Sequence, residues 1–234
     1  MKLKLPFFNR KNYIVVKAYN ENSNLVRHAP LIRSSELPPL PFFYDKTDEP
    51  KKVFNDRLTF RTCYGNVASL KRSLTVPSWQ HFKISVGDKL NIQVMQSDHE
   101  QLLGRVEFGH NEDPYYDTTN FYVVKMINRW FLEETTGVNF VYAQHIRNNT
   151  NMRAVSGLIN FRDQHCVNIF NLVSKYPHNY DIPFNMPIVA LYPMSDKPVH
   201  VECYVDKQKA DQLAIASTTR FWPVGTHLKL YNKK

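Results

Sequence analysis

Alternation of apolar and polar residues over short segments is the feature that most constrains the fold of this chain. The segments that show it are 58–63, 70–76, 81–86, 89–95, 102–108, 138–146, 154–161, 165–173, 187–192, 199–205 and 227–231. Such strands bury one face and leave the other wet, as in antiparallel sheets. Gly87 and Asp88 lie between two of them and predict a tight hairpin. The sequence therefore predicts a mainly β protein, β-rich α+β, with an antiparallel sandwich or barrel-like body, one or two helices and an extended N-terminal arm.

Two segments favour helices. In residues 120–135, apolar side chains recur at three- and four-residue steps and a glycine follows, at Phe121, Val124, Ile127, Phe131 and Gly137. This spacing predicts a helix that ends near the glycine. A second helix is expected over residues 207–216, with Asp206 as its N-terminal cap.

The first 56 residues differ from the rest and are predicted to form an arm. One strand is expected over residues 12–19, which are rich in β-branched and aromatic side chains. Residues 20–56 are irregular, and the prolines within 36–43 cannot join a central sheet. We therefore divide the chain into an aromatic and proline-rich arm, residues 1–56, and a β-rich body, residues 57–234, with a helix near 120–135. The contact residues expected on the arm are Phe7, Phe8, Tyr13, Pro38, Pro39, Pro41, Phe42, Phe43 and Tyr44.

Charge is unevenly distributed along the chain. The 30 basic and 21 acidic residues give a formal net charge of +9. The expected basic surface consists of Lys2, Lys4, Arg10, Lys11, Lys17, Arg57, Arg61, Lys71, Arg72 and Lys83. The expected acidic surface consists of Asp98, Glu100, Glu107, Glu112, Asp113 and Asp117. Because complementary fields steer association, we expect basic segments of one copy to dock on the acidic segment of another.

Few residues are arranged for chemistry. The chain has 7 glycines in 234 residues, less than half the usual share of about 7%, and it contains no phosphate-binding loop or nucleophile motif. His200 and Glu202 share a strand face while Cys203 points away from them. Cys166 is expected to be buried as a small hydrophobic residue, and the loop at His110 lacks a second histidine. We therefore expect no catalytic residue, no metal and no cofactor.

Three classes of function remain: a structural protein, a nucleic-acid-binding protein and an enzyme. The leading hypothesis is a non-enzymatic structural component of a large assembly, above all a virus or bacteriophage virion protein of the capsid, collar or tail, with the arm and complementary charge making subunit contacts. The alternative is a nucleic-acid-binding accessory protein that uses the basic segments 1–20 and 57–87, where rings and cations are mixed. An enzyme would have to use the loop at His110 or the pair His200 and Glu202.

The same hypothesis fixes the expected partners and location. We expect copies of the chain and other assembly proteins as partners, nucleic acid under the alternative, and neither a membrane nor a small-molecule substrate. No apolar run approaches the ~18 residues of a membrane helix, and three scattered cysteines fit a reducing compartment. We therefore expect a virion assembled in the host cytoplasm, or otherwise a cytoplasmic protein.

Overall fold

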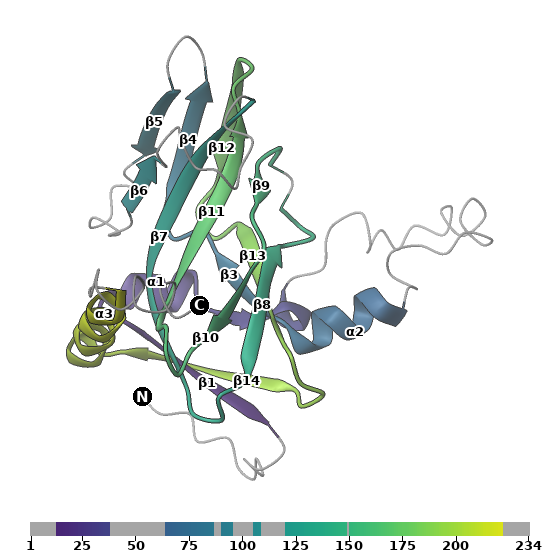
Figure 1. Ribbon diagram of the computed structural model, residues 1–234, viewed down its shortest axis with the longest axis vertical. Coiled ribbons are helices and arrows are strands. Elements are labelled where there is room, and N and C mark those ends of the chain that lie inside the picture. Colours follow the sequence, from purple (N-terminus) through teal and green to yellow (C-terminus); the bar gives the residue numbers. More distant parts are fainter. Residues whose placement is uncertain are drawn as a thin grey trace, which may run out of the picture.

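A computed structural model describes residues 13–37, 64–86, 90–95, 105–108, 120–148 and 150–221. These residues form three β-sheets and three α-helices around one main apolar core (Figure 1). The mainly β class predicted from the sequence is confirmed, and the sheets do not close into a barrel. The helices, one more than the largest number predicted, are α1 (Ser23–His28), α2 (Tyr64–Arg72) and α3 (Lys207–Phe221).

Sheet A is the largest sheet, with strand order β14-β1-β7-β11-β9 and β6 paired to β7. Its strands are β1 (Ile14–Asn20), β6 (Arg105–Phe108), β7 (Phe121–Glu134), β9 (Arg153–Ala154), β11 (Cys166–Ser174) and β14 (Val199–Val205). All pairs are antiparallel except β1 and β14, which run parallel with Ile14 beside Val199 and Asn20 beside Val205. The strand nearest the N-terminus therefore lies inside the sheet, between β14 and β7.

Sheets B and C are smaller and antiparallel. Sheet B has the order β10-β8-β13-β3-β2, with β2 (Ile32–Arg33), β3 (Leu74–Pro77), β8 (Asn139–Gln144), β10 (Gly157–Asn160) and β13 (Pro187–Pro193). Sheet C has the order β12-β4-β5, with β4 (His81–Val86), β5 (Leu90–Met95) and β12 (His178–Ile182). Val86 pairs with Leu90, which confirms the predicted pairing of these two strands as a hairpin.

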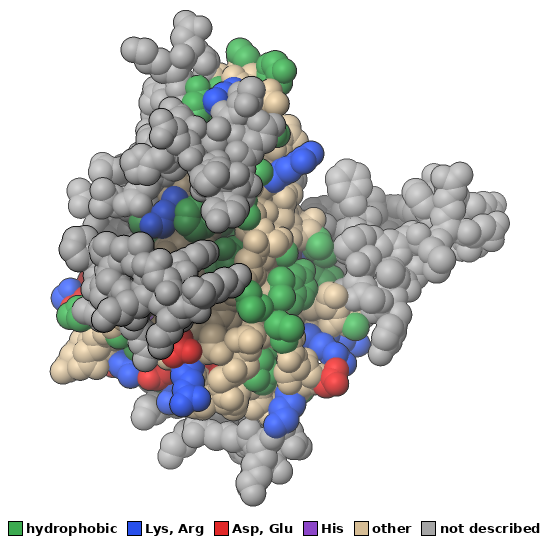
Figure 2. Space-filling view, viewed as in Figure 1, with side chains coloured by type: hydrophobic (Ala, Val, Ile, Leu, Met, Phe, Trp, Pro, Cys, Tyr) green, Lys and Arg blue, Asp and Glu red, His purple; other side chains and the backbone are tan. Residues whose placement is uncertain are grey.

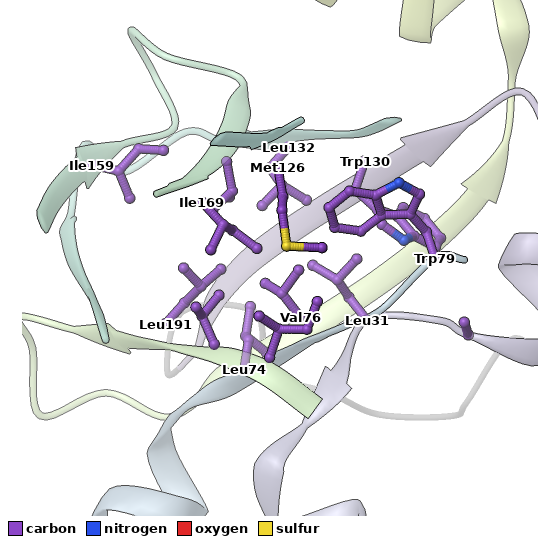
Figure 3. Packing of buried hydrophobic residues seen from close by; sticks show 14 of the residues in the cluster. Leu31, Leu74, Val76, Trp79, Met126, Trp130, Leu132, Ile159, Ile169 and Leu191 are labelled. Carbon is purple, nitrogen blue, oxygen red and sulfur yellow. The ribbon is translucent and has the colours of Figure 1, made fainter. Parts of the chain in front are cut away.

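The main core is formed by side chains that all three sheets turn inward. Figure 3 shows Met126, Trp130 and Leu132 of β7 facing residues of sheet B such as Leu74 and Leu191. Trp79 and Trp130 are fully buried, and the Trp79 ring meets Phe82 edge-on at 5.5 Å between centroids. Burial of this kind contributes roughly 25 cal/mol per Å² of apolar surface and is the main force that holds the sheets together.

The predicted helix at 120–135 is wrong, because these residues form the 14-residue strand β7. Val124, Met126, Trp130 and Leu132 alternate onto the core face and are fully buried. Apolar side chains also occupy the other face, where Phe131 packs under α3. A strand that is apolar on both faces contains three- and four-residue spacings by chance, and these resemble a helical pattern.

The predicted arm is also wrong over residues 20–37. The predicted strand in this region is confirmed as β1, but the residues that follow it pack into the body as α1, β2 and a short 3₁₀-helix (Ser34–Glu36). Leu25, Ala29 and Leu31 are buried in the main core. Their burial explains the difference, since three apolar side chains among polar neighbours are enough to hold an irregular segment against a core. The remaining arm, residues 1–12 and 38–56, lies outside the described residues.

Smaller differences concern the bounds of strands. Segment 70–76 is the end of α2 followed by β3, and segment 154–161 is divided between β9 in sheet A and β10 in sheet B. Segments 58–63 and 227–231 lie outside the described residues. The helix predicted over 207–216 is confirmed as α3, and the Lys209 backbone N–H donates to Asp206 Oδ1 at 2.9 Å, as a cap requires.

Candidate interaction surfaces on the outer faces of sheets A and B

The outer face of sheet A carries a group of charged and aromatic residues, which we call the charged face: Lys17, Tyr19, Glu133, His200, Glu202 and Tyr204. Strand register sets their order. Lys17 of β1 lies between Glu133 of β7 and Glu202 of β14. Tyr19 lies between Phe131 and Tyr204 in the next row. The structure thus brings three residues singled out in the sequence, Lys17, His200 and Glu202, onto one face.

Contacts within the charged face connect most of its members. The Tyr204 hydroxyl donates to Glu202 Oε2 at 2.5 Å, and His200 Nε2 lies 3.7 Å from the other oxygen of Glu202. From α3, the Lys209 ammonium donates to Glu133 Oε1 at 3.0 Å and lies 5.8 Å from the centroid of the Tyr19 ring. The first two contacts lie within β14, and the Lys209 contacts connect α3 to β7 and β1.

A second, small apolar cluster lies beneath these charges, between α3 and sheet A. It consists of Tyr19, Phe131, Cys166, Ala210 and Leu213. The Tyr19 and Tyr204 rings stack at 5.4 Å between centroids. Burial, reinforced by the nearby Glu133 carboxylate, raises the pKa of Tyr19 to about 12, so its hydroxyl stays protonated. The charged face therefore fixes α3 to the sheet.

The thiols of the described residues are held in their neutral form or buried. Cys203 points away from His200 and Glu202, as predicted, and its Sγ donates to the Leu31 carbonyl at 3.4 Å. Burial raises the pKa of Cys203 to about 12, whereas a nucleophile needs the thiolate. Cys166 is buried, as predicted, and its Sγ donates to the Asn128 carbonyl.

No group of three His, Cys, Asp or Glu side chains is placed to hold a metal ion in the described ranges. The loop at His110 lies outside them. His165, the neighbour of Cys166, has Nδ1 2.9 Å from the Leu132 carbonyl and supports the backbone between β7 and β11.

One buried polar chain was not foreseen, on the outer face of sheet B beneath α2 and the 3₁₀-helix. Ser73 Oγ donates to Ser34 Oγ at 2.7 Å, Ser34 Oγ lies 2.9 Å from Thr75 Oγ1, and Thr75 Oγ1 lies 3.3 Å from His145 Nε2. His145 Nδ1 accepts from the Arg147 N–H at 3.0 Å, so the neutral ring carries its proton on Nε2. A proton there prevents the imidazole from acting as a base toward Thr75. Burial lowers the pKa of His145 to about 4, which keeps it neutral.

The other half of the same sheet face carries exposed apolar residues beside Asn139 and Asn160, and we call four of its residues the sheet B patch: Val141, Leu158, Tyr192 and Met194. Leu158 pairs with Val141, and Val141 pairs with Tyr192, so three strands contribute one row. The side chain of Leu158 is 60% exposed and that of Met194 is 63% exposed. Figure 2 shows hydrophobic side chains gathered over β8, with a basic and an acidic group beside them.

Sequence reasoning missed the sheet B patch, although a signal was present. Residues Phe140, Val141 and Tyr142 are consecutive and apolar, so both faces of β8 carry apolar side chains. Phe140 is buried in the core, and Val141 faces outward. A strand of that kind has a second covering layer or an unfilled surface.

The structure describes four residues of the predicted basic surface, and these four do not lie on one sheet. Lys17 lies in sheet A, Lys71 and Arg72 end α2 beside sheet B, and Lys83 lies in sheet C (Figure 1). The other predicted basic residues lie outside the described residues. So do all the acidic ones except Glu107, whose backbone belongs to β6. Of the predicted arm contacts, only Tyr13 is described, as a half-buried residue before β1.

The described part of the chain contains no helix with the length and apolar character needed to cross a membrane. No protein-family model matches the sequence, and neither the curated proteins nor the solved structures include one significantly similar to it.

Proposed function

We propose that this chain is a non-enzymatic structural component of a large assembly, with a virus or bacteriophage particle as the favoured setting. The observation that carries the proposal is the sheet B patch, in which Leu158 and Met194 are more than half exposed beside Val141 and Tyr192. Large apolar side chains that gather on a polar surface mark sites of protein–protein contact. The partners under this proposal are copies of the chain and other proteins of the particle.

The contrast between the two outer sheet faces supports a role for the patch in assembly. On sheet A, the apolar residues Tyr19 and Phe131 are covered by α3 of the same chain. On sheet B, the described helices cover only the half that contains Thr75 and His145. The aromatic arm, residues 1–12 and 38–56, and the acidic segment 96–117 remain further proposed contacts between copies.

Protection of Met194 in the assembled particle tests the proposal. Purified particles that carry the chain and the free chain would be exposed to hydroxyl radicals, and oxidation of Met194 and Tyr176 would be compared by mass spectrometry. Tyr176 is 72% exposed and lies in the turn between β11 and β12, so it serves as the reference. We expect oxidation of Met194 to fall about tenfold in the particle and that of Tyr176 to change little. Absence of the chain from purified particles, or full oxidation of Met194 within them, would contradict the proposal.

The nucleic-acid alternative has its own supporting observation. On the outer face of sheet A, the Lys125 ammonium lies 5.9 Å from the centroid of the Phe170 ring, and Arg153 of β9 is exposed on the same face. Such pairs of rings and cations occur in single-strand binders. This function requires affinity for single-stranded nucleic acid that falls by orders of magnitude between ~50 and ~200 mM salt. A salt titration by fluorescence anisotropy would separate the two functions.

A further inference from the structure

We infer that the sheet B patch takes a second copy of this chain, packed face to face about a two-fold axis. The inference rests on the proposed function and specifies the partner and the symmetry of one contact.

Three of the four patch residues lie on paired strands. Leu158, Val141 and Tyr192 come from β10, β8 and β13 in one row, and Met194 lies next to Asn139, to whose carbonyl its N–H donates at 2.8 Å. The ladder already holds the backbone of these strands, so little backbone freedom is lost when the surface is covered. An apolar sheet face of this kind can pack against an identical face, as sheets do in a sandwich.

The charges beside the patch are of both signs. Arg72, at the end of α2, donates to Asp196 Oδ1 at 3.0 Å, and Asp196 follows Met194 by two residues. The two side chains are 46% and 99% exposed, so each can reach a second molecule. In a two-fold contact the same surface meets itself, and a border with one cation and one anion can pair Arg72 of each copy with Asp196 of the other. A border of one sign would repel a second copy.

The polar residues that adjoin the row are already bonded within the chain. Asn160 Nδ2 donates to Asn139 Oδ1 at 2.8 Å and to the Gly137 carbonyl at 3.1 Å. Covering these amides with another sheet therefore costs less than covering amides that depend on water. The charges beside the patch and its apolar surface therefore both favour the same face of a second copy as the partner.

The size of the patch determines how strongly two copies are expected to associate. A stable interface takes roughly 800 Å² from each partner, which is more than four side chains supply. We therefore expect a weak dimer of the free chain, with a dissociation constant of roughly 10–100 μM, about −7 to −5 kcal/mol at 25 °C. In an assembly, many such contacts reinforce each other.

Sedimentation velocity of the full chain over a range of concentrations tests the inference. Leu158→Asp places a charge in the patch, and Ile215→Asp does the same at an apolar residue of α3 that is 62% exposed, so it is a matched control. We expect a monomer–dimer equilibrium that Leu158→Asp weakens about tenfold or more, because a buried unpaired charge is costly. Ile215→Asp should leave it unchanged.

Charge exchange tests the two-fold arrangement. Arg72→Asp puts two acidic residues on each border and should weaken the dimer, and so should Asp196→Arg by adding a second cation. The double variant, Arg72→Asp with Asp196→Arg, restores one charge of each sign and should restore the dimer. Circular dichroism of each variant shows that the fold is retained. Single variants that leave the dimer unchanged would overturn this arrangement.

Failure of the inference differs from failure of the proposed function. If the free chain stays monomeric near 1 mM while Met194 is protected in the particle, another protein covers the patch; the self-pairing is then overturned and the proposed function stands. A dimer that is lost with Ile215→Asp and kept with Leu158→Asp would also overturn the inference. Trimers or larger rings that depend on Leu158 would exclude a two-fold contact but retain the assembly role.

Discussion

Aromatic and apolar residues are covered by the chain itself on the outer face of sheet A, whereas they are exposed on part of the outer face of sheet B. Tyr19 on sheet A stacks on Tyr204 and lies beneath α3, with its charged neighbours Glu133 and Lys209 paired. Tyr192 on sheet B lies beside Leu158 and Met194, which are largely exposed. The first face is completed by its own chain and contributes to stability. Under the proposed function the second face takes a partner, and its residues should matter more for association than for folding.

The largest expected effect tests this difference between the two faces, by replacing one tyrosine on each face with alanine. Tyr19 is 8% exposed, and Tyr19→Ala removes its ring and the stacking contact with Tyr204. We expect the free energy of unfolding to fall by about 3 kcal/mol. Tyr192→Ala removes a half-buried ring and should cost about 1 kcal/mol. Urea unfolding measures both. Equal losses would mean that the two faces contribute alike to the fold.

The covered half of sheet B should respond to pH through His145. Its folded pKa of about 4 lies below the ordinary value of 6.5, so between these values the unfolded chain binds a proton that the folded chain does not. Stability is therefore fully present above pH 6.5 and falls by about 2–3 kcal/mol as the pH drops to 4. His145→Gln keeps a polar group but does not titrate, and it should flatten this part of the stability–pH curve. Identical curves for the two proteins would refute the assignment.

Gly157 allows Tyr142 to lie close to β10 on the inner side of the patch. A Cβ at residue 157 would lie 2.5 Å from Cε1, Cζ and Oη of Tyr142. We expect Gly157→Ala to cost about 1–2 kcal/mol, because the ring has to move. In a Tyr142→Ala background the same change should cost close to nothing, and this double-mutant cycle in urea isolates the contact. An equal cost in both backgrounds would place the cause elsewhere.

The smallest expected effect concerns the ion pair on the charged face. Lys209→Met removes the contact with Glu133 and the cation beside the Tyr19 ring, and should cost about 0.5–1 kcal/mol because the groups are partly exposed. The loss should shrink between ~0.05 and ~0.5 M salt, since ions screen such pairs. Thermal unfolding at both salt concentrations measures it. A loss that does not depend on salt would indicate that the methylene groups of the side chain matter more than its charge.

The sequence predicted this fold best where one rule, the alternation of apolar and polar residues along a strand, decided the local structure. In β4, Phe82, Ile84 and Val86 alternate with polar residues, and both the strand and its hairpin partner are confirmed. The rule failed for β7, because α3, from a distant part of the chain, buries Phe131 on the outer face. It failed for α1 because few apolar residues, Leu25 and Val26 within the helix, hold that segment against the core.

The candidate surfaces could be predicted only in part, for a related reason. His200 and Glu202 are two residues apart on one strand, so their common face follows from local geometry. The residue beside Glu202 on the neighbouring strand, Lys17, comes from a distant part of the chain. The sheet B patch depends on which strands adjoin and on which half of the sheet α2 covers, and neither is determined by short segments.

The place of β1 inside sheet A affects how the protein is made. Residues 14–20 emerge early from the ribosome, yet their parallel partner is residues 199–205. Sheet A is therefore completed only after residues 199–205 have emerged, and contacts over so long a stretch of chain form slowly. Until then, the edge of β1 that pairs with β14 is unpaired and available to other strands. A chain of this design is expected to depend on chaperones until both strands have emerged from the ribosome.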